Sequence, residues 1–126
     1  MPNLDLPILV VDDAKFSSMV VGRTLRNARY RDVRIANNAP AALEFIDQRP
    51  VSVLIADWLM PEMDGLTATR EIRANPDWRD LPIISLTAKA TAQDQAQCIA
   101  AGANDYLAKP LDVDKLLSLV RVWMPR

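Results

Sequence analysis

The sequence contains no histidine. This absence excludes the catalytic triads and dyads that use histidine, histidine metal ligands, and a phosphohistidine in this chain. The single cysteine, Cys98, excludes an internal disulfide and favours a reducing compartment, so we expect a cytoplasmic protein. The three glycines (Gly22, Gly65 and Gly102) are scattered, which excludes a glycine-rich phosphate-binding loop. Any chemistry must therefore use carboxylates, lysine, hydroxyl groups or tyrosine.

The sequence also lacks an apolar run long enough to cross a bilayer, and its start, MPNLDLP, lacks the features of a secretory signal. Fifteen basic side chains stand against 16 acidic ones, giving a formal net charge of -1. Because DNA-binding proteins usually need a clustered basic face, we expect no direct contact with nucleic acid, and none with a membrane. The chain is half hydrophobic and has 126 residues, so we assign residues 1–126 to one domain with one core.

Short apolar runs alternate along the chain with segments of helical periodicity. Five such strand–helix units with short connections predict an α/β fold, in which helices cover both faces of a parallel sheet. The predicted strands span residues 7–11, 32–36, 51–57, 81–88 and 105–109, and the predicted helices span about 15–28, 39–46, 66–74, 91–101 and 113–123.

Several residues predict where these helices begin and end. Asn38 and Asp112 are suitable N-caps, and Gly102 is suitable for the residue after the fourth helix. The third helix should end before Pro76, because a residue that precedes proline avoids the helical conformation. The expected buried faces are Phe16, Met19, Val20 and Thr24 in the first helix, and Val113, Leu116, Leu117, Val120 and Trp123 in the last.

Polar residues follow or end four of the predicted strands. Asp12 and Asp13 follow the first strand, Asp57 ends the third, Thr87 lies at the end of the fourth, and Lys109 ends the fifth. The carboxyl ends of parallel strands share one edge of a sheet, and ligands bind there at the point where the winding reverses. If the first and third strands are neighbours, three carboxylates converge in one crevice.

Three carboxylates that share a crevice repel one another unless a cation or a proton neutralises them. Mg²⁺ prefers oxygen ligands and is often held by carboxylates together with a phosphate. Lys109 supplies a positive charge for an anion, and Thr87 supplies a hydroxyl donor. This set of groups is typical of a phosphoryl-transfer site, and the available nucleophile is a carboxylate, which gives an aspartyl phosphate.

Each of these residues also has a simpler structural interpretation. Asp13 could cap the first helix, Asp64 with Gly65 could form a turn, Thr87 could be an ordinary strand residue, and Lys109 could be a solvated charge. A site is favoured because suitable residues occur together at four strand ends.

Four segments together resemble the receiver domain of two-component response regulators, and the resemblance extends over essentially the whole chain. They are VVDD (10–13), DWLMPEMDG (57–65), LTA (86–88) and DYLAKP (105–110). The resemblance implies a flavodoxin-like fold, a single doubly wound five-stranded parallel sheet with strand order 2-1-3-4-5 and helices on both faces.

The resemblance also implies roles for the site residues. Asp57 would accept a phosphoryl group from a phosphohistidine on a histidine kinase or a histidine phosphotransfer protein. Asp12, Asp13, Asp57 and the backbone carbonyl of Leu59 would bind Mg²⁺, and Lys109 would pair with a phosphoryl oxygen. The domain would be a regulatory phosphoacceptor that catalyses its own phosphorylation and dephosphorylation, and not an enzyme with a separate substrate.

In such a domain Thr87 would move to bond the phosphoryl group, and Tyr106 would change rotamer. The surface of the fourth helix, fifth strand and fifth helix would then change, controlling a downstream protein or an attached output domain and allowing a homodimer. Leu59 cannot orient a hydrolytic water, so we predict a long-lived phosphoryl group. Lys89 would lie close to the incoming donor and modulate the reaction.

Other functions remain open. A Mg²⁺-dependent phosphohydrolase would also use an aspartyl phosphate, but such enzymes usually have a second aspartate where this chain has Leu59. A pseudo-receiver would bind partners without phosphorylation, although the acidic residues are intact here, and a flavin or nucleotide binder would need a phosphate-binding loop. The chain could be a stand-alone regulator, the first domain of a longer one, or part of a hybrid kinase; Met1 close before the first strand favours the first two.

Overall fold

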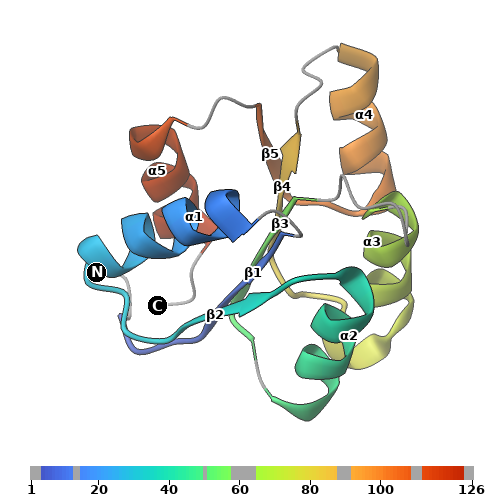
Figure 1. Ribbon diagram of the computed structural model, residues 1–126. Helices are drawn as coiled ribbons and strands as arrows, with labels where there is room; N and C mark the ends of the chain where they lie inside the picture. Colours follow the sequence, from blue (N-terminus) through green and yellow to red (C-terminus); the bar gives the residue numbers. More distant parts are fainter. Residues whose placement is uncertain are drawn as a thin grey trace.

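The computed structural model describes residues 4–12, 15–49, 51–57, 65–87, 92–108 and 112–123. The chain forms three layers around a central parallel sheet (Figure 1). Helices α1 (Lys15–Asn27) and α5 (Val113–Trp123) cover one face of the sheet. Helices α2 (Ala39–Gln48), α3 (Gly65–Ala74) and α4 (Ala92–Ala101) cover the other, as predicted for a doubly wound fold.

The sheet has five strands in the order β2-β1-β3-β4-β5, and each neighbouring pair is parallel. Both the strand order and the parallel pairing confirm the predicted topology. The strands are β1 (Ile8–Val11), β2 (Val33–Ala36), β3 (Val53–Asp57), β4 (Ile83–Thr87) and β5 (Asp105–Ala108).

The predicted helix caps are confirmed. Asn38 Oδ1 accepts a hydrogen bond from the Ala41 N–H across 2.7 Å at the start of α2. At the start of α5, Asp112 Oδ1 accepts hydrogen bonds from the N–H groups of Asp114 and Lys115, at 3.0 and 3.2 Å. Gly102 follows α4 with a φ of +117°, a conformation that glycine adopts without the steric cost of a Cβ.

A short 3₁₀ helix, η1 (Pro76–Trp78), was not predicted. Asn75 caps it by accepting a hydrogen bond from the Asp77 N–H across 2.9 Å. Pro76 ends α3, as expected, and its fixed φ also suits the first turn of a new helix.

The sheet separates two clusters of buried apolar residues. Because side chains alternate along a strand, Ile8 and Val10 of β1 pack on the α1–α5 side, and Leu9 and Val11 pack on the α2–α3 side. All four side chains have no exposed surface, which explains the continuous apolar run in the sequence.

The predicted buried face of α1 was wrong. Met19 and Val20 are 57% and 39% exposed, and the buried side chains are instead Ser18, Val21 and Leu25. These three residues also have helical spacing, but Ser18 interrupts the apolar pattern on their face. The face with Met19 and Val20 is more continuously apolar in the sequence, and it was therefore predicted to be buried. Of the other predicted residues on this face, Thr24 is half-buried and the side chain of Phe16 lies outside the described set.

The predicted buried face of α5 is confirmed at its centre. Leu116 and Val120 are fully buried, and Leu117 and Trp123 pack against the same cluster. Val113 is 45% exposed, so the buried stripe begins one turn later than predicted.

Candidate functional site

The strand register places Asp12 and Asp57 at the same level on neighbouring strands. Val11 of β1 pairs with Ala56 of β3. Asp12 follows Val11 and Asp57 follows Ala56, so the two aspartates come directly after this pair. The Asp12 N–H also donates to the Ala36 carbonyl across 3.0 Å, which continues the ladder with β2. The sheet winds outward from β1 toward β2 and from β3 toward β5, so the two aspartates lie at the point where the winding reverses.

Asp12 has no exposed surface. A carboxylate at this depth requires hydrogen bonds or a cation, because its transfer out of water is costly. This burial distinguishes Asp12 from a solvated turn residue. Asp57 is the last residue of β3, and the structure describes its backbone but not its side chain.

Thr87 ends β4 beside the end of β5. Asp57 pairs with Leu86, and Thr87 pairs with Ala108, after which Lys109 follows in the sequence. The backbones of Asp12, Asp57 and Thr87 therefore reach one edge of the sheet, as predicted. The side chain of Thr87 lies outside the described set, as do all atoms of Asp13, Leu59, Lys89 and Lys109.

Among the described residues, no group of three or more aspartate, glutamate, cysteine or histidine side chains could hold a metal ion. Two of the predicted magnesium ligands, Asp13 and Leu59, fall outside those residues, and the Asp57 side chain does too. The magnesium site therefore stays a prediction.

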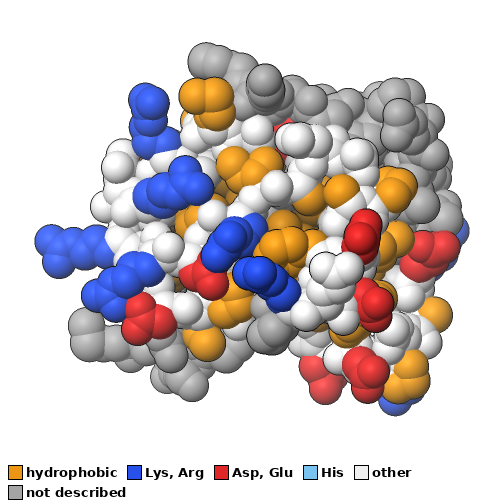
Figure 2. Space-filling view, turned by 60° about the horizontal axis from the view of Figure 1, so that its bottom comes forward, with side chains coloured by type: hydrophobic (Ala, Val, Ile, Leu, Met, Phe, Trp, Pro, Cys, Tyr) orange, Lys and Arg blue, Asp and Glu red, His pale blue; other side chains and the backbone are white. Residues whose placement is uncertain are grey.

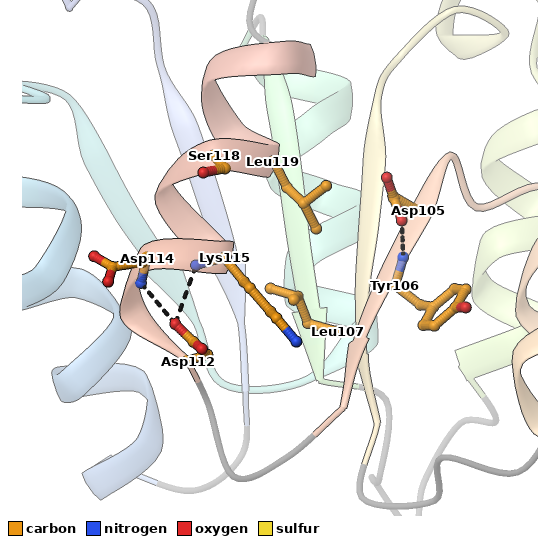
Figure 3. A pocket seen from close by; sticks show the side chains of 8 residues that line it. All are labelled: Asp105, Tyr106, Leu107, Asp112, Asp114, Lys115, Ser118 and Leu119. Atoms are coloured by element: carbon orange, nitrogen blue, oxygen red, sulfur yellow. Dashed lines mark hydrogen bonds between the residues drawn. The ribbon is translucent and has the colours of Figure 1, made fainter.

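Tyr106 is half-buried in β5. Its ring lies on the opposite side of the strand from Leu107, which packs into the core beneath α5 (Figure 3). Its N–H donates to Asp105 Oδ1 across 2.9 Å. The ring is thus on the sheet face covered by α4, where the predicted rotamer change would act.

An open groove of about 400 Å³ lies between β5 and α5 (Figure 3). Lys115 reaches across it from α5 toward β5, and Leu107 and Leu119 form its apolar part. At the other end of α5, the Trp123 Nε1 donates to Asp105 Oδ2 across 3.3 Å, which ties the end of the helix to the start of the strand. The groove is part of the surface that was predicted to change.

Arg73, on α3, has a structural role that was not predicted from the sequence. Its Nε donates to the Gly102 carbonyl across 2.9 Å, and its Nη2 donates to Asn104 Oδ1 across 2.7 Å. The same Asn104 oxygen accepts a hydrogen bond from the Ile83 N–H at 2.8 Å. These bonds join α3, the turn after α4 and the start of β4.

Arg73 also holds the η1 segment. Its Nη1 donates to the carbonyls of Trp78 and Arg79, each at 3.1 Å. Burial lowers the pKa of Arg73, and the nearby negative charge of Asp80 partly offsets that effect. The acceptors include three backbone carbonyls, which leave no trace in the residue types, so the sequence gives no signal for this network.

Comparison with known proteins identifies the family. The sequence model described as "Response regulator receiver domain" matches residues 8–121. The chain is 36% identical over 119 residues to the response regulator MprA of Mycobacterium leprae, covering 94% of this chain and 51% of MprA. It is 35% identical over 106 residues to the chemotaxis protein CheY1 of Helicobacter pylori, covering 83% of this chain and 86% of CheY1. The chain thus spans about half the length of MprA and most of the length of CheY1.

A solved structure gives the same result. The receiver domain of the sensor histidine kinase PA1611 from Pseudomonas aeruginosa superposes with a TM-score of 0.86 at 36% identity, covering 94% of this chain and 97% of that one. That domain has a magnesium ion coordinated in its active-site cleft. The chain belongs to the response regulator receiver domain family of two-component phosphorelay systems.

Among the described residues, no helix is long and apolar enough to cross a membrane.

Proposed function

We propose that this chain accepts a phosphoryl group on Asp57 from a phosphohistidine donor, in a Mg²⁺-dependent reaction. The main support is that Asp12, directly after β1, and Asp57, the last residue of β3, lie at the carboxyl ends of neighbouring central strands, at the point where the winding reverses. In the transfer, the phosphorus–nitrogen bond of the donor breaks as a phosphorus–oxygen bond forms to the Asp57 carboxylate. Membership of the receiver family supports a regulatory phosphoacceptor role.

The donor groups at this edge suit Mg²⁺. Asp12, Asp13, Asp57 and the Leu59 carbonyl would supply oxygen ligands, which Mg²⁺ prefers, and the related PA1611 domain binds this ion in its cleft. When bound, the ion would neutralise charge on the phosphoryl oxygens. The complete burial of Asp12 supports this assignment, because a buried carboxylate is stabilised by a nearby cation.

Three further residues would act on the phosphoryl group or respond to it. Lys109 follows the end of β5 and would pair with a phosphoryl oxygen. Thr87 ends β4 and would donate a hydrogen bond to that group, after which Tyr106 would change rotamer. Phosphorylation would thereby change the α4–β5–α5 surface, which controls a downstream protein or an attached output domain and is a candidate surface for a homodimer.

Intact-mass analysis after incubation with acetyl phosphate tests the acceptor. We expect one phosphoryl adduct that requires Mg²⁺ and is lost in Asp57→Asn. Asp47→Asn is the matched control, because Asp47 is exposed near the end of α2 and should leave the adduct unchanged. Absence of an adduct in the wild-type chain would favour a pseudo-receiver, and rapid multiple turnover with phosphate release would favour a phosphohydrolase.

Metal binding is tested separately by the shift in thermal unfolding on addition of Mg²⁺. Asp12→Asn should abolish most of the shift while keeping the fold, because the amide replaces a charged oxygen with a neutral one. Asp47→Asn should keep the shift. An equal shift in wild type and Asp12→Asn would exclude Asp12 as a ligand.

A further inference from the structure

The exposed charges are unevenly distributed over one face of the molecule. Figure 2 shows lysine and arginine side chains concentrated on one half of this face and acidic side chains concentrated on the other. Five exposed arginines fall within a 12-residue stretch that runs from the last turns of α1 to the start of β2. This surface, the arginine corner, consists of Arg23, Arg26, Arg29, Arg31 and Arg34.

Nearby acids neutralise only part of the arginine corner. Arg31 pairs with Asp5, and Arg34 pairs with Asp32, so five guanidinium groups and two carboxylates leave a net charge of +3. Among the described residues, the side chains of Arg23 and Arg29 have no hydrogen-bond or ion-pair partner. These two side chains are therefore free to contact an anionic group on another molecule.

The acidic half contains a groove suited to a guanidinium group. It has a volume of about 450 Å³ and is lined by Asp47 from the end of α2 and by Asp77 and Trp78 from η1. One side of Trp78 packs against the core, and the residue is only half-buried. A guanidinium group can pair with carboxylates and stack on an indole at the same time, which an ammonium group does less well. We call this surface the acidic groove.

We propose that the arginine corner of one copy of this chain binds the acidic groove of a second copy. The charges are complementary, and both surfaces lie toward the amino ends of the strands, since α1 and α2 end there and η1 precedes β4. The described part of the chain thus provides both the guanidinium donors and the matching carboxylates.

A two-fold axis would satisfy both contacts at once. When a face has a basic half and an acidic half, rotation by 180° about an axis that lies in that face along the boundary between the halves places each half on the opposite half of the partner. The resulting interface is isologous and closed, so the expected product is a dimer and not a filament. The dimer uses a different surface from α4–β5–α5.

The expected dimer is weak and sensitive to salt. Exposed ion pairs are screened within about 10 Å at 0.1 M ionic strength, and Arg49 lines the acidic groove beside the carboxylates and reduces its negative charge. We therefore expect the dissociation constant of the dimer to rise at least about tenfold between 50 and 500 mM NaCl.

Two charge-reversed variants provide the decisive test by sedimentation velocity. Arg23→Glu with Arg29→Glu makes both halves of the face acidic, and Asp47→Lys with Asp77→Lys makes both halves basic. Each variant alone should be monomeric at 50 mM NaCl, and an equimolar mixture should form a heterodimer. Arg70→Glu reverses the charge of an exposed residue on α3 and controls for the change in net charge. This variant should dimerise as strongly as the wild-type chain.

Circular dichroism establishes that each variant is folded. A wild-type chain that stays monomeric at 50 mM NaCl and millimolar concentration would overturn the proposal. So would a dimer that persists in either variant, because another surface would then be responsible. Phosphorylation by acetyl phosphate is scored separately, since Asp57 lies at the carboxyl end of β3, and its failure would bear only on the proposed acceptor.

Discussion

Arg73 Nη2 and Asn104 Oδ1 are joined by a 2.7 Å hydrogen bond between residues 31 positions apart in the chain. Asn104 Oδ1 also accepts a hydrogen bond from the N–H of Ile83, the first residue of β4. The contact therefore connects α3 to the sheet as well as to the turn that follows α4. The end of α4 is thus fixed relative to α3.

Arg73→Met should lower the free energy of unfolding by roughly 2 kcal/mol, because it removes charge-assisted hydrogen bonds and leaves half-buried acceptors without a donor. Urea denaturation measures the change. Arg70→Met is the matched control, because Arg70 is exposed on the same helix and should change stability by less than about 0.5 kcal/mol. Equal effects in the two variants would contradict this role for Arg73.

Gly102→Ala should destabilise the fold by roughly 1–3 kcal/mol for two separate reasons. The φ of +117° disfavours any side chain, and an added Cβ would lie 2.6 Å from Arg73 Cγ. Arg73→Ala removes the second reason, so Gly102→Ala should cost less in that background. A double-mutant cycle in urea measures the difference, and strict additivity would show that the close contact is unimportant.

Stability should fall above pH 10 because of Tyr30. Burial raises the pKa of Tyr30 above its ordinary value of 10.0, an effect only partly offset by the positive charge of Arg121. The unfolded phenol then ionises before the folded one, so the stabilisation is complete below pH 10 and declines as pH rises toward the folded pKa. The slope is at most about 1.4 kcal/mol per pH unit.

Tyr30→Phe removes this titration and provides the comparison. Urea unfolding from pH 9 to 11 should show a steeper loss of stability in the wild-type chain than in the variant. Parallel profiles would mean that Tyr30 ionises equally readily in both states.

Leu59→Asn should shorten the lifetime of the phosphorylated chain several-fold, because the amide can orient a hydrolytic water that leucine cannot. The decay of the phosphoryl adduct, followed by intact mass after removal of acetyl phosphate, measures the half-life. Leu59→Met keeps the position apolar and should keep the long lifetime. If the asparagine variant decays as slowly as the methionine variant, residue 59 does not control hydrolysis.

The sequence predicted the sheet well because β1, β3 and β4 are buried on both faces. Their apolar runs are continuous, and turn and capping residues such as Asn38 and Gly102 mark the helix ends. The predicted and observed elements differ mainly at their ends, where the last residues of a strand or helix lose their pairing partners.

Two features could not be predicted from local pattern. On α1 the buried face includes Ser18, so hydrophobic periodicity favoured the stripe that contains Met19. The bonds of Arg73 join residues brought together only by the completed fold, and most of their acceptors are backbone atoms. At the candidate site, the sequence predicted which strand ends would meet, whereas the metal ligands and the reactive side chains remain predictions.

The short edge strand β2 bears on the behaviour of concentrated solutions. It has four residues, and its two central side chains, Arg34 and Ile35, are exposed. Arg34 is held by Asp32 in an ion pair at this edge, so an incoming strand would meet a charge beside a very short template. Such an edge resists the addition of strands from other molecules, so fibril growth should not begin at β2.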